Sequence, residues 1–366
     1  MKTFQKESLF EASHPLYSEV FTEASIFFDI ETTGFAPGRT FVYLIGCASR
    51  RNNIICTSQF FAENPQDEEL VIRAFLALLK QYKTIITFNG IGFDMSYLRA
   101  RCNVLGIQED FSPYICIDIY KSLSGFKKIL KLNNLKQKTL ETFLDLNRED
   151  AYSGGELINI YLDYVKTQDS NSLSVMRLHN LEDVMGMIGL LPIFAYVQLF
   201  QGNFTVRDVD IQAYEEYEGK VALELMFSID CPYAIPKRFS YGLHSVYISG
   251  FQNSIKLKVK IYQGELKFFY SNYKDYYYLP DEDEAIHKSV AFYVDKNFRT
   301  QAKAANCYSK RTGCFLPQYK EIFTPYFKLE YNDKHAYFEM TDEFTDSIEA
   351  QKKYLQHLLW YMLEQK

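Results

Sequence analysis

The sequence lacks several features that would assign it to a specialised class of protein. It has no CxxC pair and no His/Cys cluster with zinc spacing, and its seven cysteines are an odd number, so neither a zinc module nor a disulfide framework is indicated. It has no excess of positive charge, because 46 acidic residues outnumber 40 basic ones and the formal net charge is −6. Any polyanionic partner must therefore be bound by local patches of charge.

Long apolar runs are also scarce. Residues 1–17 are polar and hold no apolar signal core, and reduced thiols suit the cytoplasm, which is the expected location. The uncharged run 184–200 is shorter than the roughly 20 residues of a membrane span and contains Pro192 and Gln198. It predicts a buried helix that kinks or ends near Pro192, and we expect no membrane partner.

The first two hundred residues combine strand and helix patterns. Residues 25–62 contain three apolar runs separated by turn-forming stretches, which predicts a meander of three strands. A helix is expected from Pro65, with Leu70, Ala74 and Leu78 on its apolar face. The strand TIITF, a helix closed by a glycine and then mainly helical segments follow. This order predicts an α/β domain with a mixed sheet over residues 1–200.

The pattern changes beyond residue 200. SIKLKVKIY and ELKFFYS alternate apolar and polar residues with a period of two, and Asn332–Asp333 suits a hairpin turn. A last amphipathic segment runs from Asp342 to Gln365 and includes Ile348 at helical spacing. Residues 201–366 are therefore expected to form a smaller antiparallel β-rich domain with a C-terminal helix.

Two acidic residues end the first apolar run, FFDIETTGF. Asp29 and Glu31 are two apart on a predicted strand, so their side chains share one face while Ile30 points to the other. Carboxylates held that close repel each other, and a cation between them relieves the repulsion. The pair taken alone is weak evidence, because solvated acids are common at strand ends.

Two further segments supply matching groups. TFNGIGFD places Asp94 at the opening of a helix, and HNLED places His179 and Asp183 four residues apart on one helix face. Asp94 alone could be a helix N-cap, and His179 alone could be a core or capping histidine. Four carboxylates and an imidazole are nevertheless a donor set that suits Mg²⁺ or Mn²⁺.

These three motifs, DIETTG, NGIGFD and HNLED, resemble in order those of the DEDD-type (DnaQ-like) 3′-to-5′ exonucleases of the ribonuclease-H-like superfamily. FVYLIG and NREDAYSGG are similar to segments of the bacterial YprB-like predicted exonuclease group. The resemblance covers roughly residues 20–200 and implies a ribonuclease-H-like mixed sheet with flanking helices. It also implies two Mg²⁺ or Mn²⁺ ions, with the metal ligands and the histidine as the catalytic residues: Asp29, Glu31, Asp94, His179 and Asp183.

The resemblance implies roles for further residues. His179 would orient or deprotonate the attacking water, although its offset of four from Asp183 is the one familiar from Tyr-type members, where His-type members have five. Substrate contacts would come from four residues outside the metal ligands: Thr32, Thr33, Asn89 and Arg148. In the alternative interpretation these residues have only structural roles: Thr32, Thr33 and Asn89 make turns, and Arg148 forms a surface salt bridge.

Two stretches are basic and free of acids, residues 121–138 and 296–311. Solvated surface explains most such runs, and phosphate contact is the alternative for both. The second stretch lies among many Tyr and Phe residues, which could grip a single strand by stacking or could simply be core.

The sequence thus predicts a metal-dependent 3′-to-5′ exonuclease that hydrolyses single-stranded DNA or RNA with a free 3′ end. The β-rich domain would position substrate or bind a protein partner. An inactive nucleic-acid-binding or scaffold protein with the same fold is the alternative, and an endonuclease of the broader ribonuclease-H-like group is a third possibility.

Overall fold

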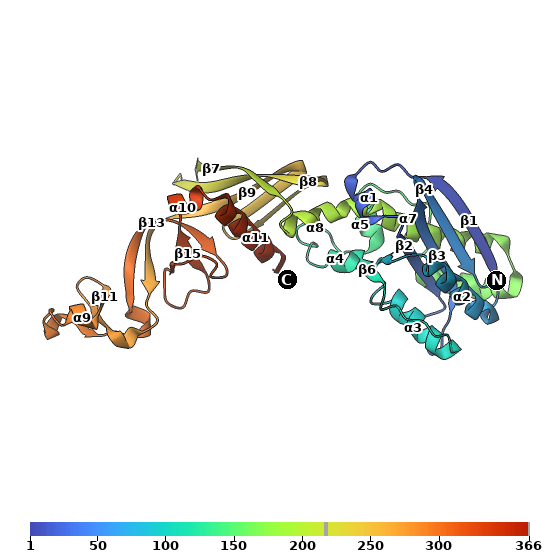
Figure 1. Ribbon diagram of the computed structural model, residues 1–366, viewed down its shortest axis with the longest axis horizontal. Coiled ribbons are helices and arrows are strands. Elements are labelled where there is room, and N and C mark those ends of the chain that lie inside the picture. Colours follow the sequence, from blue (N-terminus) through green and yellow to red (C-terminus); the bar gives the residue numbers. More distant parts are fainter. Residues whose placement is uncertain (216–218, 365–366) are drawn as a thin grey trace. The chain divides into compact units, whose positions relative to one another are not determined.

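The computed structural model describes residues 1–215 and 219–364, which form two compact units (Figure 1). Unit 1 comprises Met1–Val197 and Tyr233–Lys237, and unit 2 comprises Gln198–Pro232 and Arg238–Lys366. The sequence analysis placed the boundary between residues 200 and 201. In the structure, the short segment Tyr233–Lys237 belongs to unit 1, where the Lys237 carbonyl accepts a hydrogen bond from the Tyr196 hydroxyl (2.6 Å).

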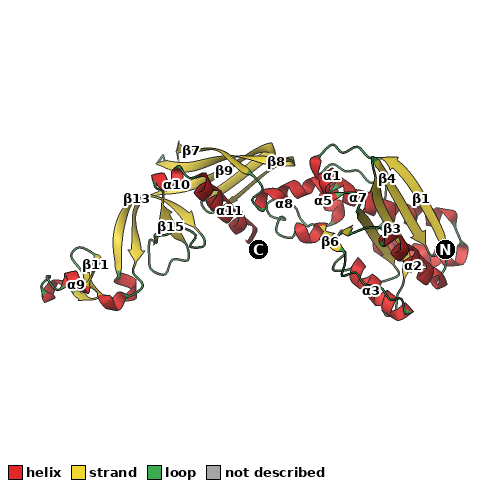
Figure 2. Cartoon of the chain, in the orientation of Figure 1, coloured by secondary structure: helices red, strands yellow, loops and turns green. Residues whose placement is uncertain are grey.

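Unit 1 is built on a mixed six-stranded sheet in the order β1-β4-β3-β2-β5-β6 (Figure 2). The strands are β1 (Lys2–Leu9), β2 (Ser25–Thr32), β3 (Val42–Arg51), β4 (Ile54–Phe61), β5 (Thr84–Thr87) and β6 (Ile115–Asp118). β2, β3 and β4 pair antiparallel and form the predicted meander, whereas β2, β5 and β6 run parallel. The polar edge strand β1 was not predicted, because it pairs only along β4 and carries no buried stripe.

Helices flank this sheet, as predicted. Their bounds are α1 (Pro15–Val20), α2 (Glu68–Leu79), α3 (Asp94–Leu105), α4 (Ile119–Ser122), α5 (Gln137–Phe143), α6 (Gly154–Thr167), α7 (Ser170–Gly189) and α8 (Phe194–Phe200). The prediction that Leu70 lies on the buried face of α2 was wrong, since its side chain is 54% exposed. The buried stripe is shifted by one residue to positions such as Val71 and Phe75, which join the unit 1 core.

The apolar run near Pro192 is a core element. α7, the short 3-10 helix η2 (Leu191–Ile193) and α8 follow each other over Ser170–Phe200. In the most apolar 18-residue stretch of this segment, 72% is buried inside the protein. The run is long and apolar enough to cross a membrane, but a buried core helix of a globular unit meets the same criteria. The prediction of a buried helix interrupted near Pro192 is confirmed.

Unit 2 contains a second six-stranded sheet, antiparallel and ordered β14-β15-β13-β9-β8-β7, and a small sheet ordered β11-β10-β12. The strands are β7 (Thr205–Glu215), β8 (Val221–Leu243), β9 (Val246–Phe269), β10 (Tyr276–Leu279), β11 (Glu284–His287), β12 (Thr300–Gln301), β13 (Tyr308–Gln318), β14 (Tyr326–Phe327) and β15 (Ala336–Glu339). SIKLKVKIY and the first five residues of ELKFFYS belong to the single long strand β9, which ends at Phe269. The antiparallel β-rich architecture is therefore as predicted.

The C-terminal helix was predicted as one element from Asp342 to Gln365. It consists of α10 (Asp342–Thr345) and α11 (Ile348–Glu364), and Gln365 lies outside the described residues. Ile348 was expected on the buried face but is 67% exposed, because it begins α11, before the packed stripe that contains Tyr354 and Leu358.

Buried His357 of α11 leads to a prediction about stability and pH. Its Nε2 accepts the Tyr319 N–H (2.8 Å), and burial together with nearby Lys320 lowers its pKa to about 4. Because the folded pKa lies below the unfolded value of about 6.5, the neutral form stabilises the fold above pH 6.5 and this contribution is lost as pH falls toward 4. We expect the loss to reach about 2–3 kcal/mol of unfolding free energy at pH 4.

Denaturant unfolding at several pH values measures this effect. His357→Gln retains an acceptor for Tyr319 and should show a flatter decline between pH 6.5 and 4 than the parent. His287→Gln, at an exposed histidine, is the matched control and should decline as the parent does. Equal pH profiles for the parent and His357→Gln would contradict the prediction.

Candidate active site

The first acidic pair lies at the end of β2. Asp29 and Glu31 follow the alternation expected of a strand, and the regular pairing of β2 with β3 breaks directly after Glu31. The backbone N–H of Ile30 donates to Asp94 Oδ1 (3.1 Å), although Ile30 belongs to β2 and Asp94 begins α3. Asp94 is the first residue of α3 and Phe93 is the N-cap residue, so Asp94 does not have the N-cap role that was the alternative. Its carboxylate instead connects α3 to the acidic end of β2.

Helix α7 lies directly against this strand end. Asn180 Nδ2 donates to Asp29 Oδ2 (3.1 Å), and Asn180 Oδ1 accepts from Gln59 Nε2 (3.0 Å). The close approach requires Gly46 on β3, because a Cβ there would lie 1.9 Å from Asn180 Oδ1. Asn180 thus fixes the position of α7, and with it the neighbouring His179.

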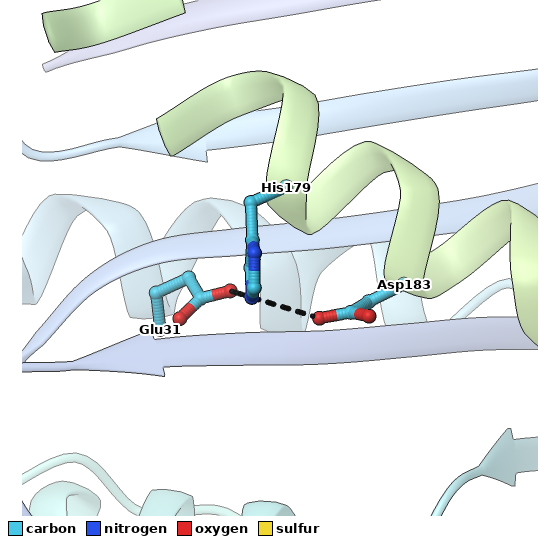
Figure 3. A group of neighbouring side chains, drawn as sticks. All are labelled: Glu31, His179 and Asp183. Atoms are coloured by element: carbon cyan, nitrogen blue, oxygen red, sulfur yellow. Dashed lines mark ion pairs between the residues drawn. The ribbon is translucent and has the colours of Figure 1, made fainter. Parts of the chain in front are cut away.

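His179 and Asp183 project from α7 toward Glu31 (Figure 3). His179 Nε2 lies 3.2 Å from Asp183 Oδ2 and 3.7 Å from Glu31 Oε1. One ligand atom from each of the three residues lies within 4.8 Å of the others. The structure therefore brings the first and third sequence motifs together, as their residue types implied.

The carboxylates repel one another strongly. Burial raises the pKa of Asp29 well above its usual range, and the charges of Asp94, Asp183 and Glu31 raise it further. Burial raises the pKa of Glu31 to about 8, against the opposing effect of His179. It raises that of Asp94 to about 7, although backbone N–H groups donate to its carboxylate. These four acids form one electrostatic cluster.

Asp150 holds the other side of the imidazole. His179 Nδ1 lies 2.8 Å from Asp150 Oδ2, and Lys138 Nζ contacts the same oxygen at 2.9 Å. The Asp150 side chain is only 1% exposed. Burial alone would lower the pKa of His179, but Asp183, Glu31 and Asp150 outweigh it and raise the value to about 9.

Arg148 lies in a buried ion-pair network and not in a surface salt bridge. Its guanidinium contacts Glu141 and lies 2.6 Å from Asp183 Oδ1, with a side chain 11% exposed. Glu141 packs against α7 where Gly186 leaves room, since a Cβ there would lie 1.9 Å from Glu141 Oε1. These contacts make Arg148 a support for Asp183, and its role as a substrate contact stays a prediction.

The other predicted substrate contacts form local hydrogen bonds: Thr32 ends β2, whereas Thr33 and Asn89 lie in the loops that follow β2 and β5. Thr32 Oγ1 donates to the Gly34 carbonyl (2.9 Å), and Thr33 Oγ1 accepts from the Phe41 N–H (3.1 Å). Asn89 has a left-handed backbone (φ 59°), and its N–H donates to Asp118 Oδ1 (3.0 Å). Thr33 and Asn89 therefore lie in connecting segments, as the alternative interpretation expected, whereas Thr32 belongs to the strand. Substrate contacts of all three residues stay predictions.

Sequence reasoning did not identify four residues that hold the cluster in place: Asp118, Glu141, Asp150 and Asn180. Two of them lie in segments that the sequence analysis had already singled out: Asn180 follows His179 directly, and Asp150 belongs to the NREDAYSGG segment. No sequence pattern pointed to Glu141 or Asp118. Their partners come from other elements, and only the fold brings them together.

The cluster fits a divalent cation. Glu31 and Asp94 are buried, and within residues 1–215 and 219–364 neither Asp29 nor Asp94 has a basic side chain within ion-pair distance. Asp29 and Asp94 therefore face neighbouring acids without a compensating charge from the described residues, and carboxylate oxygens of this kind suit Mg²⁺ or Mn²⁺. The four carboxylates that would hold such ions are Asp29, Glu31, Asp94 and Asp183.

Comparisons with known proteins agree with this fold. Residues 26–193 match the model of the RNase H superfamily. The uncharacterized protein YprB of Bacillus subtilis is 24% identical over 183 residues, which cover 49% of this chain and 44% of that protein. The present chain thus aligns with less than half of that relative.

Solved structures give weaker matches. The family B DNA polymerase of the hyperthermophilic archaeon Pyrobaculum calidifontis has a TM-score of 0.39 at 20% identity, over 48% of this chain and 25% of that one. E. coli Exonuclease I in complex with a dT13 oligonucleotide has a TM-score of 0.31 at 10% identity, over 93% and 71%. Scores this low do not establish a shared fold on their own. The assignment rests on the family model and on the mixed sheet, and residues 26–193 form an RNase H-like superfamily domain.

Proposed function

We propose that this protein is a metal-dependent 3′-to-5′ exonuclease acting on single-stranded nucleic acid. The observation that carries the proposal is the close approach of Glu31, His179 and Asp183, with Asp29 and Asp94 near enough for their charges to act on the same group. An RNase H-like fold and the order of the three motifs support it. Two Mg²⁺ or Mn²⁺ ions, when bound, would lower the pKa of the attacking water and stabilise the leaving 3′ oxygen.

The protein's own residues would divide the remaining tasks. The four carboxylates would hold the ions and thereby position the scissile phosphate. His179 Nε2 faces the cluster and would orient or deprotonate the attacking water. Asp150 keeps the ring in this orientation through Nδ1. Thr32 at the end of β2, together with Thr33 and Asn89 in the loops that follow β2 and β5, would contact the terminal nucleotide.

Degradation of labelled oligonucleotides tests the proposal. With Mn²⁺, a single strand labelled at its 5′ end should shorten stepwise from the 3′ end and release 5′-mononucleotides. A circular single strand should persist, whereas an endonuclease would cut it. Matched DNA and RNA strands run side by side determine the sugar preference. Intact linear strands after long incubation with Mn²⁺ would refute the proposed activity.

The inactive scaffold is the second candidate, favoured by the four-residue offset between His179 and Asp183 and by the acidic net charge. Calorimetric titration with Mn²⁺ separates the two. An enzyme should bind Mn²⁺ and lose that binding in Asp183→Asn. A scaffold without turnover has no reason to keep such a site.

Asp150 provides a prediction about turnover. Asp150→Asn should lower kcat about 10–100-fold with little change in KM or in Mn²⁺ affinity, because Asp150 acts on the orientation and on the raised pKa of His179. Asp145→Asn is the matched control, since Asp145 lies nearby but its side chain is 77% exposed, and it should behave as the parent does. Steady-state kinetics and Mn²⁺ titration make the measurement. A change in KM alone, or lost metal binding, would contradict a positioning role for Asp150.

A further inference from the structure

An exposed aromatic patch lies in unit 2. We call residues 287–303 the tip; it includes α9 (Lys288–Ala291), η4 (Lys296–Phe298) and β12, and α9 lies beside β11 (Figure 1). Phe292, Tyr293 and Phe298 are 77%, 86% and 57% exposed. Single exposed aromatics are ordinary, but three within seven residues form a patch of the kind that marks an interaction site.

The charge of the tip is positive although the chain is acidic. It carries four cationic side chains, Lys288, Lys296, Arg299 and Lys303, against the single acid Asp295. These cations alternate with the aromatic rings along the chain, and the Arg299 guanidinium lies 4.9 Å from the centre of the Tyr277 ring. Alternating cations and exposed rings complement a phosphate backbone with unpaired bases.

A pocket rich in tyrosine adjoins the tip. Its volume is about 430 Å³, and it is lined by Phe269, Tyr270, Ser271, Tyr273, Ala304, Tyr326, Lys328 and Tyr331. No acidic side chain is among these lining residues of the described chain. Tyr273 and Tyr331 are 36% and 42% exposed, so their rings are accessible for stacking.

Two contacts join the pocket to the tip. Gln301 Nε2 of β12 donates to the Tyr273 carbonyl (3.2 Å). Lys288 of α9 forms an ion pair with Asp275, which lies in the same short 3-10 helix as Tyr273 (Tyr273–Asp275). The pocket and the tip are therefore parts of one continuous surface within unit 2.

We propose that this surface binds single-stranded nucleic acid, with bases stacking in the tyrosine pocket and on Phe292, Tyr293 and Phe298 while the lysines and Arg299 contact phosphates. This inference rests on the proposed function and extends it. It identifies a second surface for the substrate, formed by residues far in sequence from the candidate active site. Stacking tolerates every base, so the surface binds without sequence preference.

Fluorescence anisotropy with a labelled 20-nucleotide dT or U strand tests the proposal. The full chain carries Asp29→Asn and is kept in EDTA, so binding is measured whether or not the parent has nuclease activity. Tyr293→Ala and Phe298→Ala should each weaken binding about tenfold. Tyr331→Ala should do the same, and Tyr331→Phe should restore binding because it retains the stacking ring. Tyr247→Ala, at a 44% exposed tyrosine of β9, should bind as the parent does.

The salt dependence gives an independent measurement. Lys296→Ala and Arg299→Ala should each reduce the slope of log affinity against log salt by about 0.7, the value for one released counterion on a single strand. Unchanged affinity in all the tip and pocket variants would overturn the proposal. So would concentration-dependent self-association that Tyr293→Ala abolishes in light scattering, because the patch would then be a contact between copies of this chain.

Discussion

Asp29→Asn should abolish hydrolysis and stabilise the metal-free protein at the same time. The substitution removes a carboxylate placed to hold the ions, which should slow cleavage at least about 10³-fold, corresponding to several kcal/mol of lost transition-state stabilisation. It also removes a negative charge that Asp94, Asp183 and Glu31 repel. An amide at position 29 retains an acceptor for Asn180 Nδ2, so we expect about 1–2 kcal/mol of added unfolding free energy in EDTA.

Thermal melts with and without Mn²⁺ measure both effects beside the oligonucleotide assay. Added Mn²⁺ should raise the Tm of the parent, because the ion binds only the folded chain, and should raise that of Asp29→Asn much less. Asp163→Asn, at an exposed acid of α6, is the control and should leave both activity and Tm unchanged. Cleavage retained in Asp29→Asn, or a parent that Mn²⁺ does not stabilise, would remove the basis for the proposed metal site.

Arg148→Ala should cause the largest loss of stability. The substitution leaves the Glu141 carboxylate, whose side chain is 2% exposed, without its guanidinium partner and also frees Asp183. Removing one member of a buried ion pair costs about 3–5 kcal/mol, because the other charge stays buried and unpaired. Urea unfolding of unit 1 measures the loss. A residue whose only role is to contact substrate would raise KM without this change.

Two comparisons separate the parts of the Arg148 effect. Arg148→Met combined with Glu141→Leu should recover most of the stability, since it replaces the pair by apolar side chains of similar size, while cleavage stays low because Asp183 is no longer held. Arg101→Ala breaks the buried pair with Glu68 elsewhere in unit 1. It should destabilise to a similar extent but leave the turnover of the folded fraction intact. Full activity in folded Arg148→Ala would show that Asp183 needs no such support.

The sequence alone was sufficient to predict a mixed sheet, its three-stranded meander and the residues of the acidic cluster, but not the edge strand β1. Each motif is a short stretch whose geometry depends on local periodicity: Asp29 and Glu31 share a strand face, and His179 and Asp183 share a helix face. That the three motifs face one another follows from where strands end and helices begin in such a sheet. Local patterns of this kind are legible without knowing any long-range contact.

Only the tertiary structure decided what surrounds these groups. Asp150 lies 29 residues from His179 in sequence, yet their side chains are 2.8 Å apart, and no periodicity relates two such positions. For Arg148 the sequence suggested a substrate contact or, as the alternative, a surface salt bridge, because its buried partners belong to the distant elements α5 and α7. The pKa of His179 depends on the same distant carboxylates. Burial and electrostatic environment are properties of packed elements, so they were decided by the fold and not by any segment.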